Sequence, residues 1–169
     1  MSGAGRITVH VKYGDVEQTF NGSVEDVWLS VNKFFAGFVP TFEIADRLVL
    51  KVDLQRLLKD CEGIIAFSAE GANVLIPRNK LTDNEALGLL LLASYVGFQL
   101  GKLNSDAVSR DELQAKLGKA PKIVSTRLGE LVKGEWAVKM VDDKYRMTTF
   151  GVVQMQKEIL PRTKAKASQ

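Results

Sequence analysis

The stretch that decides the fold spans residues 109–151 and reads SRDELQAKLGKAPKIVSTRLGELVKGEWAVKMVDDKYRMTTFG. Ser109 and Glu112 form a capping-box pattern at the start of a short helix whose inward positions are Leu113 and Leu117. The turn at residues 118–120 comes next, and Pro121 is suited to the first turn of a second helix. The pattern therefore predicts two helices joined by a tight turn.

The second helix, residues 121–133, has an apolar and a polar side. The inward positions are Ile123, Val124, Leu128, Leu131 and Val132, and the outward positions are Lys122, Ser125, Thr126, Arg127 and Glu130. Alternating residues at 136–141 and 145–148 then predict a β-hairpin with the tip Asp142-Asp143-Lys144. Thr149 is expected to cap a final helix.

This order of helix, turn, helix, hairpin and helix resembles the winged-helix superfamily, especially the MarR-like and ArsR-like regulators. The resemblance covers residues 83–160 and is carried by Ser125-Thr126-Arg127-Leu128, Glu130-Leu131-Val132, Tyr145-Arg146-Met147-Thr148 and Phe150-Gly151. It implies a helix in the major groove of DNA with a β-ribbon beside it. No family is identified for residues 1–80.

The resemblance and the polar side chains together give a candidate DNA-contact set. Its members are Lys119, Lys122, Ser125, Thr126, Arg127, Lys139, Lys144 and Arg146. Lysine, arginine and small hydroxyls at a helix start suit phosphate and base-edge contact. Asp142 and Asp143 depart from the family pattern, in which the wing tip usually offers Arg or Lys to phosphate. Carboxylates at this position would instead repel a phosphate backbone.

The first part of the chain predicts a separate α+β domain over residues 1–80. Alternation at 7–11 and at 16–20 predicts a hairpin, and residues 64–76 predict a second one. Helices are expected from Ser23 and Asp53, whereas residues 41–50 are ambiguous between helix and extended chain. The economical packing is one antiparallel sheet covered by helices. Residues 77–80 form the expected boundary, 81–161 the winged-helix domain and 162–169 a basic, disordered tail.

One helix between these parts is apolar on nearly all sides, and Thr82 and Glu85 predict a capping box at its start. Residues 87–100 carry no charge, but 14 residues are too few for a membrane span, which needs about 20. The segment is therefore expected to be a buried helix, packed between the two domains or between two subunits of a dimer. Gly97 and Gly101 are expected to let another backbone approach closely, with Gly101 near the helix end.

Composition argues against several functional classes. The chain has 169 residues with one cysteine and one histidine, so neither a zinc site nor a cysteine–histidine dyad with an orienting group can be assembled from them. Cys61 is expected to be buried, and the lack of cysteine pairs fits a cytoplasmic protein. No P-loop, GxGxxG or GxSxG motif is present, so neither an enzyme nor a cofactor is expected. Residues 1–80 have net charge −1 and residues 81–169 net charge +4, which suits a polyanionic partner.

Three functional hypotheses follow from the sequence. The first is a DNA-binding protein, a transcriptional regulator or chromatin-associated factor, that binds double-stranded DNA as a homodimer and senses a ligand or a protein partner through its N-terminal domain. The second is a protein-interaction module whose winged helix does not bind DNA. The third is single-stranded nucleic-acid binding through the aromatic cluster of Trp28, Phe34, Phe35 and Phe38, although their helical spacing favours core packing.

Overall fold

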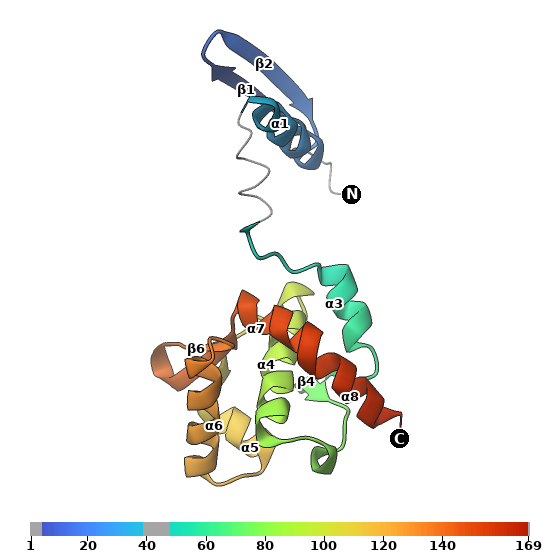
Figure 1. Cartoon of the computed structure of the whole chain (residues 1–169), viewed down its shortest axis with the longest axis vertical. Helices are drawn as coiled ribbons and strands as arrows, with labels where there is room; N and C mark the ends of the chain where they lie inside the picture. Colours follow the sequence, from blue (N-terminus) through green and yellow to red (C-terminus); the bar gives the residue numbers. More distant parts are fainter. Residues whose placement is uncertain (1–4, 39–47, 169) are drawn as a thin grey trace. The chain divides into compact units, whose positions relative to one another are not determined.

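The computed structural model describes residues 5–38 and 48–168, and it is a mixed α/β structure. The chain divides into two compact units, Met1–Leu50 and Lys51–Gln169 (Figure 1). The expected boundary at residues 77–80 lies inside the second unit. The reason is packing: Leu57, Cys61 and Ile64, which precede that boundary, belong to the same buried core as the helix that follows it.

The first unit consists of a hairpin and one helix. Strands β1 (Ile7–Tyr13) and β2 (Val16–Gly22) pair antiparallel, and α1 (Val24–Phe38) follows. Among the described side chains of α1, Val27 and Phe34 are buried, and the Phe34 ring makes an edge contact with Phe20, 5.9 Å between centroids. The predicted hairpin and helix are confirmed here. Most of residues 41–50, the ambiguous segment, lie outside the described residues.

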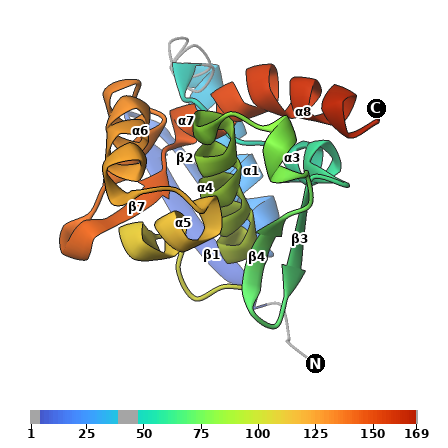
Figure 2. The same ribbon diagram turned by 90° about the horizontal axis from the view of Figure 1, so that it is seen from below.

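The second unit is built around α4 (Asp83–Gln99). Thr82 and Glu85 form the predicted capping box at its start, and its middle is buried almost completely, with Leu87, Leu89 and Leu91 at 0% exposure. Figures 1 and 2 show α4 between α6 on one side and α3 with β4 on the other. The apolar helix is therefore covered by its own unit. No helix among the described residues has the length and apolar content to cross a membrane.

Before α4 come α3 (Leu54–Cys61), β3 (Ile65–Ser68), β4 (Gly71–Val74) and the short helix η1 (Arg78–Lys80). Asp53 caps α3 as predicted, since its side chain accepts a hydrogen bond from the Arg56 amide. Strands β3 and β4 form a second, separate two-stranded sheet, so the expected single N-terminal sheet is wrong. Each hairpin packs on a different helix: β1 and β2 on α1, and β3 and β4 on α4.

After α4 the elements are β5 (Val108–Ser109), α5 (Arg110–Leu117), α6 (Pro121–Lys133), β6 (Ala137–Lys139), the one-turn helix η2 (Val141–Asp143) and β7 (Lys144–Met147). The three strands form one antiparallel sheet in the order β5-β7-β6. The chain ends with α7 (Thr149–Gln154), a π-helical turn η3 (Met155–Ile159) and α8 (Leu160–Ala167). The cap of α7 is Thr148 rather than Thr149, because the Thr148 hydroxyl accepts from the Gly151 amide.

Residues 160–167 form the helix α8, whereas the sequence predicted disorder from residue 162 onward. Thr163 is fully buried, and its hydroxyl donates to the Ile159 carbonyl. Lys164 and Lys166 reach back across the unit: Lys164 donates to the Lys59 carbonyl, and Lys166 lies 2.9 Å from the Glu85 carboxylate. Composition gave no sign of these long-range contacts.

Two other expectations concern small side chains. Cys61 is buried as expected, and burial raises the pKa of its thiol to about 12, which keeps it protonated. Gly97 does not admit another backbone: a Cβ there would meet the side chains of Leu103 and Phe67 at 2.7 and 2.8 Å. Gly97 therefore makes room for side chains that close over the end of α4.

The Glu85–Lys166 contact predicts a pH-dependent contribution to stability. Burial raises the pKa of Glu85, but the hydrogen bond from the Thr82 amide and the interaction with Lys166 outweigh it and hold the pKa below its usual value. A carboxyl group with a lowered pKa stabilises the fold above the unfolded pKa, about 4.3, and that contribution is lost as pH falls through the folded pKa. Glu85→Gln is expected to cost roughly 1–3 kcal/mol at pH 7 and less at pH 3.

Urea unfolding followed by circular dichroism at several pH values between 7 and 3 measures this. The control is Glu62→Gln, an exposed glutamate of the same unit, which should follow the wild type throughout. A gap between wild type and Glu85→Gln that stays constant from pH 7 to pH 3 would contradict the assignment.

Candidate nucleic-acid interface

The turn between α5 and α6 sets the position of the candidate interface. Ser109 caps α5 through the Glu112 amide, and Gly118 ends it at φ 67°, a left-handed conformation that glycine adopts without strain. Pro121 then occupies the first turn of α6, as predicted. Two short helices are thereby joined through three residues, with Lys119 exposed on the connection.

Helix α6 presents most of the predicted contact residues. Val124, Leu128 and Leu131 are its buried side, whereas Lys122, Ser125 and Thr126 are exposed. Ile123, predicted to point inward, is 40% exposed. The inward stripe of α6 is therefore narrower than the sequence suggested.

The first turn of α6 is open and lacks acidic residues. Its cap, Ala120, has no side chain that could accept from the helix amides, and Pro121 and Lys122 follow. By contrast, α4 and α5 both carry carboxylates in the first turn and have Thr82 and Ser109 as side-chain caps. Pro121 has no amide hydrogen, and the Ile123 and Val124 amides donate to the Ala120 carbonyl, so few first-turn amides of α6 are available to a ligand. What favours an anion here is the positive end of the helix dipole with Lys122 and no carboxylate beside it.

The sheet places the remaining basic residues beside α6. On β7, Lys144 and Arg146 are exposed, while the alternate residues Tyr145 and Met147 are buried. Lys139, at the end of β6, is exposed but is engaged in an ion pair with Asp143, with 3.0 Å between Nζ and Oδ1. Lys139 is therefore less available to an external anion than the two β7 cations.

The acidic tip is partly neutralised. Asp143 lies between Lys139 and Arg110, whose Nε is 3.1 Å from Oδ2, and its hydrogen bond with Lys139 holds the pKa of Asp143 below its usual value. The same hydrogen bond raises the pKa of Lys139. Asp142 is exposed at φ 58° and has no ion pair in the described part of the chain. The sequence gave no signal for the role of Arg110.

Arg127 is the predicted residue whose surroundings differ most from expectation. Its Nη1 lies 2.9 and 3.1 Å from the two carboxylate oxygens of Glu130, and Asn84 of α4 donates to the same carboxylate at 2.8 Å. The Asn84 hydrogen bond, followed by that of Arg127, lowers the pKa of Glu130. The i,i+3 spacing could have indicated the Arg127–Glu130 pair. The hydrogen bond from Asn84 to Glu130 could not be predicted in this way, because the two residues are 46 positions apart in the sequence.

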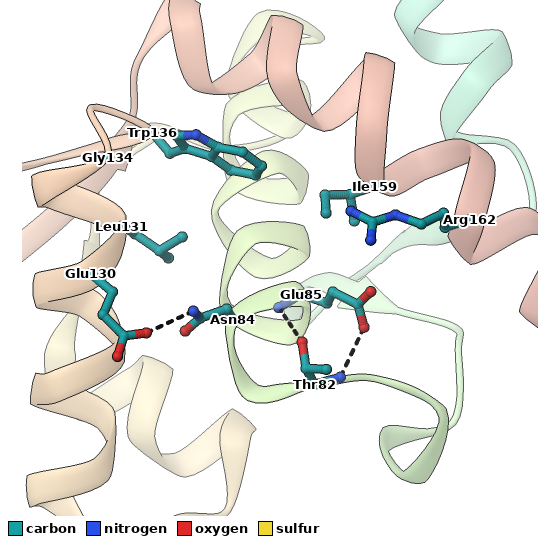
Figure 3. A pocket seen from close by; sticks show the side chains of 9 residues that line it. All are labelled: Thr82, Asn84, Glu85, Glu130, Leu131, Gly134, Trp136, Ile159 and Arg162. Atoms are coloured by element: carbon teal, nitrogen blue, oxygen red, sulfur yellow. Dashed lines mark hydrogen bonds between the residues drawn. The ribbon is translucent and has the colours of Figure 1, made fainter.

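A pocket of about 350 Å³ adjoins this cluster between α4, α6 and α8. It is lined by Thr82, Asn84, Glu85, Glu130, Leu131, Gly134, Trp136, Ile159 and Arg162. Figure 3 shows Glu130 at the left, Arg162 at the right and Trp136 above. None of these residues except Glu130 belongs to the predicted outward face of α6, and the sequence pattern did not indicate a cavity.

The structure thus brings Lys119, Lys122, Ser125 and Thr126 together on α6 and its approach, and Lys139, Lys144 and Arg146 on the neighbouring sheet. Among the described residues, no group of three or more His, Cys, Asp or Glu could hold a metal ion. The chemistry that this surface offers is charge and hydrogen bonding. No protein-family model, curated protein or solved structure matches the chain.

Proposed function

We propose that the chain binds double-stranded DNA through α6, with the β6–β7 hairpin alongside, in the manner of a winged helix. The observation that carries the proposal is the open, acid-free first turn of α6 with Lys119, Lys122 and Ser125 exposed around it. Lys119 and Lys122 face solvent there, at the positive end of the helix dipole, where a phosphate could approach. A role in transcription or chromatin is the biological context that we propose for this activity.

The hairpin supports the proposal through β7 rather than through its tip. Lys144 and Arg146 are exposed, and no ion pair engages them among the described residues. Asp143 is held by Arg110 and Lys139, so Asp142 is the carboxylate at the tip that would repel DNA. We expect α6 and β7 to contribute the phosphate contacts and the tip to remain away from the backbone.

The proposal predicts a position-dependent effect along α6. Lys122→Ala is expected to weaken binding to a mixed-sequence duplex about 5- to 10-fold at low salt, because it removes one phosphate contact. Lys133→Ala is the matched control, a lysine in the last turn of the same helix, and should change the affinity less than about twofold. Fluorescence anisotropy with a labelled duplex of about 25 base pairs measures both. Equal losses in the two variants would contradict a contact at the helix start.

A second candidate function is protein binding through the hairpin tip. Val141 is 81% exposed, and Asp142 beside it has no ion pair among the described residues, so the tip offers an apolar side chain and a carboxylate rather than a cation. On this alternative the chain retains a protein partner after nuclease treatment and does not shift duplex DNA. The single-strand alternative has less support. Phe34 is buried and Phe35 partly buried, the side chain of Phe38 lies outside the described residues, and Trp28, at 67%, is the one exposed aromatic side chain among those described on α1.

A further inference from the structure

The pocket between α4, α6 and α8 has the size and the lining of a small-molecule site. Its volume of about 350 Å³ falls at the lower end of the range for ligand pockets. Leu131, Trp136 and Ile159 give it an apolar body, and the aromatic ring of Trp136 forms its upper wall (Figure 3). The polar side chains are Thr82, Asn84, Glu85, Glu130 and Arg162, and they lie at different sides of the pocket, an arrangement that can orient a bound molecule.

One side of the pocket offers hydrogen-bond acceptors. The Glu130 carboxylate lies there, and its lowered pKa keeps it charged. The Asn84 side chain donates to Glu130 through its nitrogen, while its oxygen is buried and has no hydrogen-bond partner among the described residues. Gly134 marks the C-terminal end of α6, where the helix dipole also favours a cation. This side suits a ligand ammonium group.

The opposite side offers a cation. Arg162 of α8 uses its Nε to donate to the Glu158 carbonyl, and its two terminal nitrogens have no partner in the described part of the chain. Figure 3 shows its guanidinium directed into the pocket beside Ile159. Glu85 also lines the pocket, but its negative charge is offset by Lys166, whose Nζ lies 2.9 Å from Oε2, so the Arg162 charge is left for a ligand. This side suits a carboxylate.

We propose that this pocket binds a small zwitterion whose ammonium and carboxylate groups lie at opposite ends of an apolar body, the chemistry of an apolar dipeptide. Its ammonium group binds Glu130 and the Asn84 oxygen, its carboxylate binds Arg162, and its side chains rest on Trp136 and Leu131. A free α-amino acid carries both charges on one carbon, whereas Glu130 and Arg162 belong to helices on opposite sides of the pocket (Figure 3).

The same site is connected to the candidate DNA surface through Glu130. Its carboxylate holds Arg127 at 2.9 Å, so a ligand ammonium group competes with Arg127 for it. Release of Arg127 frees a guanidinium for phosphate, and on this point the inference rests on the proposed DNA binding. The expected result is a few-fold increase in duplex affinity when the pocket is filled.

Isothermal titration calorimetry of the full chain with L-leucyl-L-leucine and L-leucyl-L-phenylalanine tests the site without DNA. We expect binding with a Kd below about 1 mM and a loss of at least about tenfold in Arg162→Met. The N-acetylated dipeptide and the C-amidated dipeptide each lack one charge. Each should bind to the wild-type chain about as weakly as the free dipeptides bind to Arg162→Met. The matched control is Arg56→Met, an exposed arginine of α3 outside this pocket, which should bind like the wild type.

Several results would overturn the proposal: no heat of binding at millimolar dipeptide, equal binding by Arg162→Met and Arg56→Met, or equal binding of free leucine and the dipeptide. Circular dichroism of both variants checks that they are folded. Because the titration contains no DNA, its failure is distinguishable from a failure of the proposed DNA binding, and dipeptide binding without an effect on duplex affinity would remove only the connection through Arg127.

Discussion

Replacing Gly151 with alanine is expected to lower the free energy of unfolding of the Lys51–Gln169 unit by roughly 3 kcal/mol or more. Gly151 is buried in the first turn of α7, where the backbone of Trp136 crosses it. A Cβ at this position would overlap the Trp136 carbonyl oxygen and lie 2.8 Å from its carbonyl carbon. Backbone atoms cannot rotate away as a side chain can, so the crossing must shift.

The crossing cannot shift freely, because hydrogen bonds hold it. The Thr148 amide donates to the Trp136 carbonyl at 3.0 Å, and the Thr148 hydroxyl accepts from the Gly151 amide at 2.8 Å. A shift of Trp136, which precedes β6, therefore breaks its hydrogen bond with Thr148, which follows β7 and caps α7. This contact joins the sheet to the helix that follows it.

Gly129→Ala provides the matched control. Gly129 lies inside α6, is exposed, and has no atom within 4 Å of the position that a Cβ would occupy. Alanine is the better helix former, so this change should raise the free energy of unfolding by about 0.5–1 kcal/mol. Urea unfolding followed by the fluorescence of Trp136, in a Trp28→Phe background, measures both. A Gly151→Ala variant as stable as the wild type would contradict the close approach of the Trp136 backbone to Gly151.

Leu128→Ala is expected to have the second large effect, a loss of about 3 kcal/mol. Leu128 is fully buried on α6 and belongs to the core that includes Leu87 and Leu91 of α4. Its removal leaves a cavity under the helix that presents Lys122 and Ser125. We therefore expect weaker duplex binding at temperatures where the variant begins to unfold, and normal binding where it remains folded.

Ile123→Ala is the control on the same helix. The sequence pattern placed Ile123 inward with Leu128, but its 40% exposure predicts a cost below about 1 kcal/mol. The same urea titration compares the two variants. An equal cost for both would show that α6 is rotated relative to the arrangement described above.

The sequence predicted the elements whose signals are local. The caps at Asp53, Thr82 and Ser109, the turn at Gly118 and the start of α6 at Pro121 all depend on residues within one turn of each other. These features follow from backbone hydrogen bonds that a nearby side chain can complete. The two N-terminal hairpins were also predictable, because a turn fixes the pairing of adjacent strands.

What the sequence did not predict are contacts between distant parts of the chain. The two hairpins have similar sequence patterns, yet β1 and β2 pack on α1 whereas β3 and β4 pack on α4. No local signal in the sequence distinguishes the two cases. The order of α8 depends on the burial of Thr163 and on Lys166 reaching Glu85. The pocket depends on Arg162 lying across from Glu130, 32 positions earlier in the chain. A pattern within one helix does not contain that information.

The salt dependence of duplex binding tests the central claim most directly. The cations of this surface that no ion pair engages among the described residues are Lys119, Lys122, Lys144 and Arg146. With these contacts, log Kobs should fall linearly with log salt between 50 and 200 mM with a slope of roughly −4. The double variant Lys119→Ala/Lys122→Ala should reduce the magnitude of that slope by about 2. No binding to a mixed duplex at 50 mM salt, or the same slope in the double variant, would contradict DNA binding through α6.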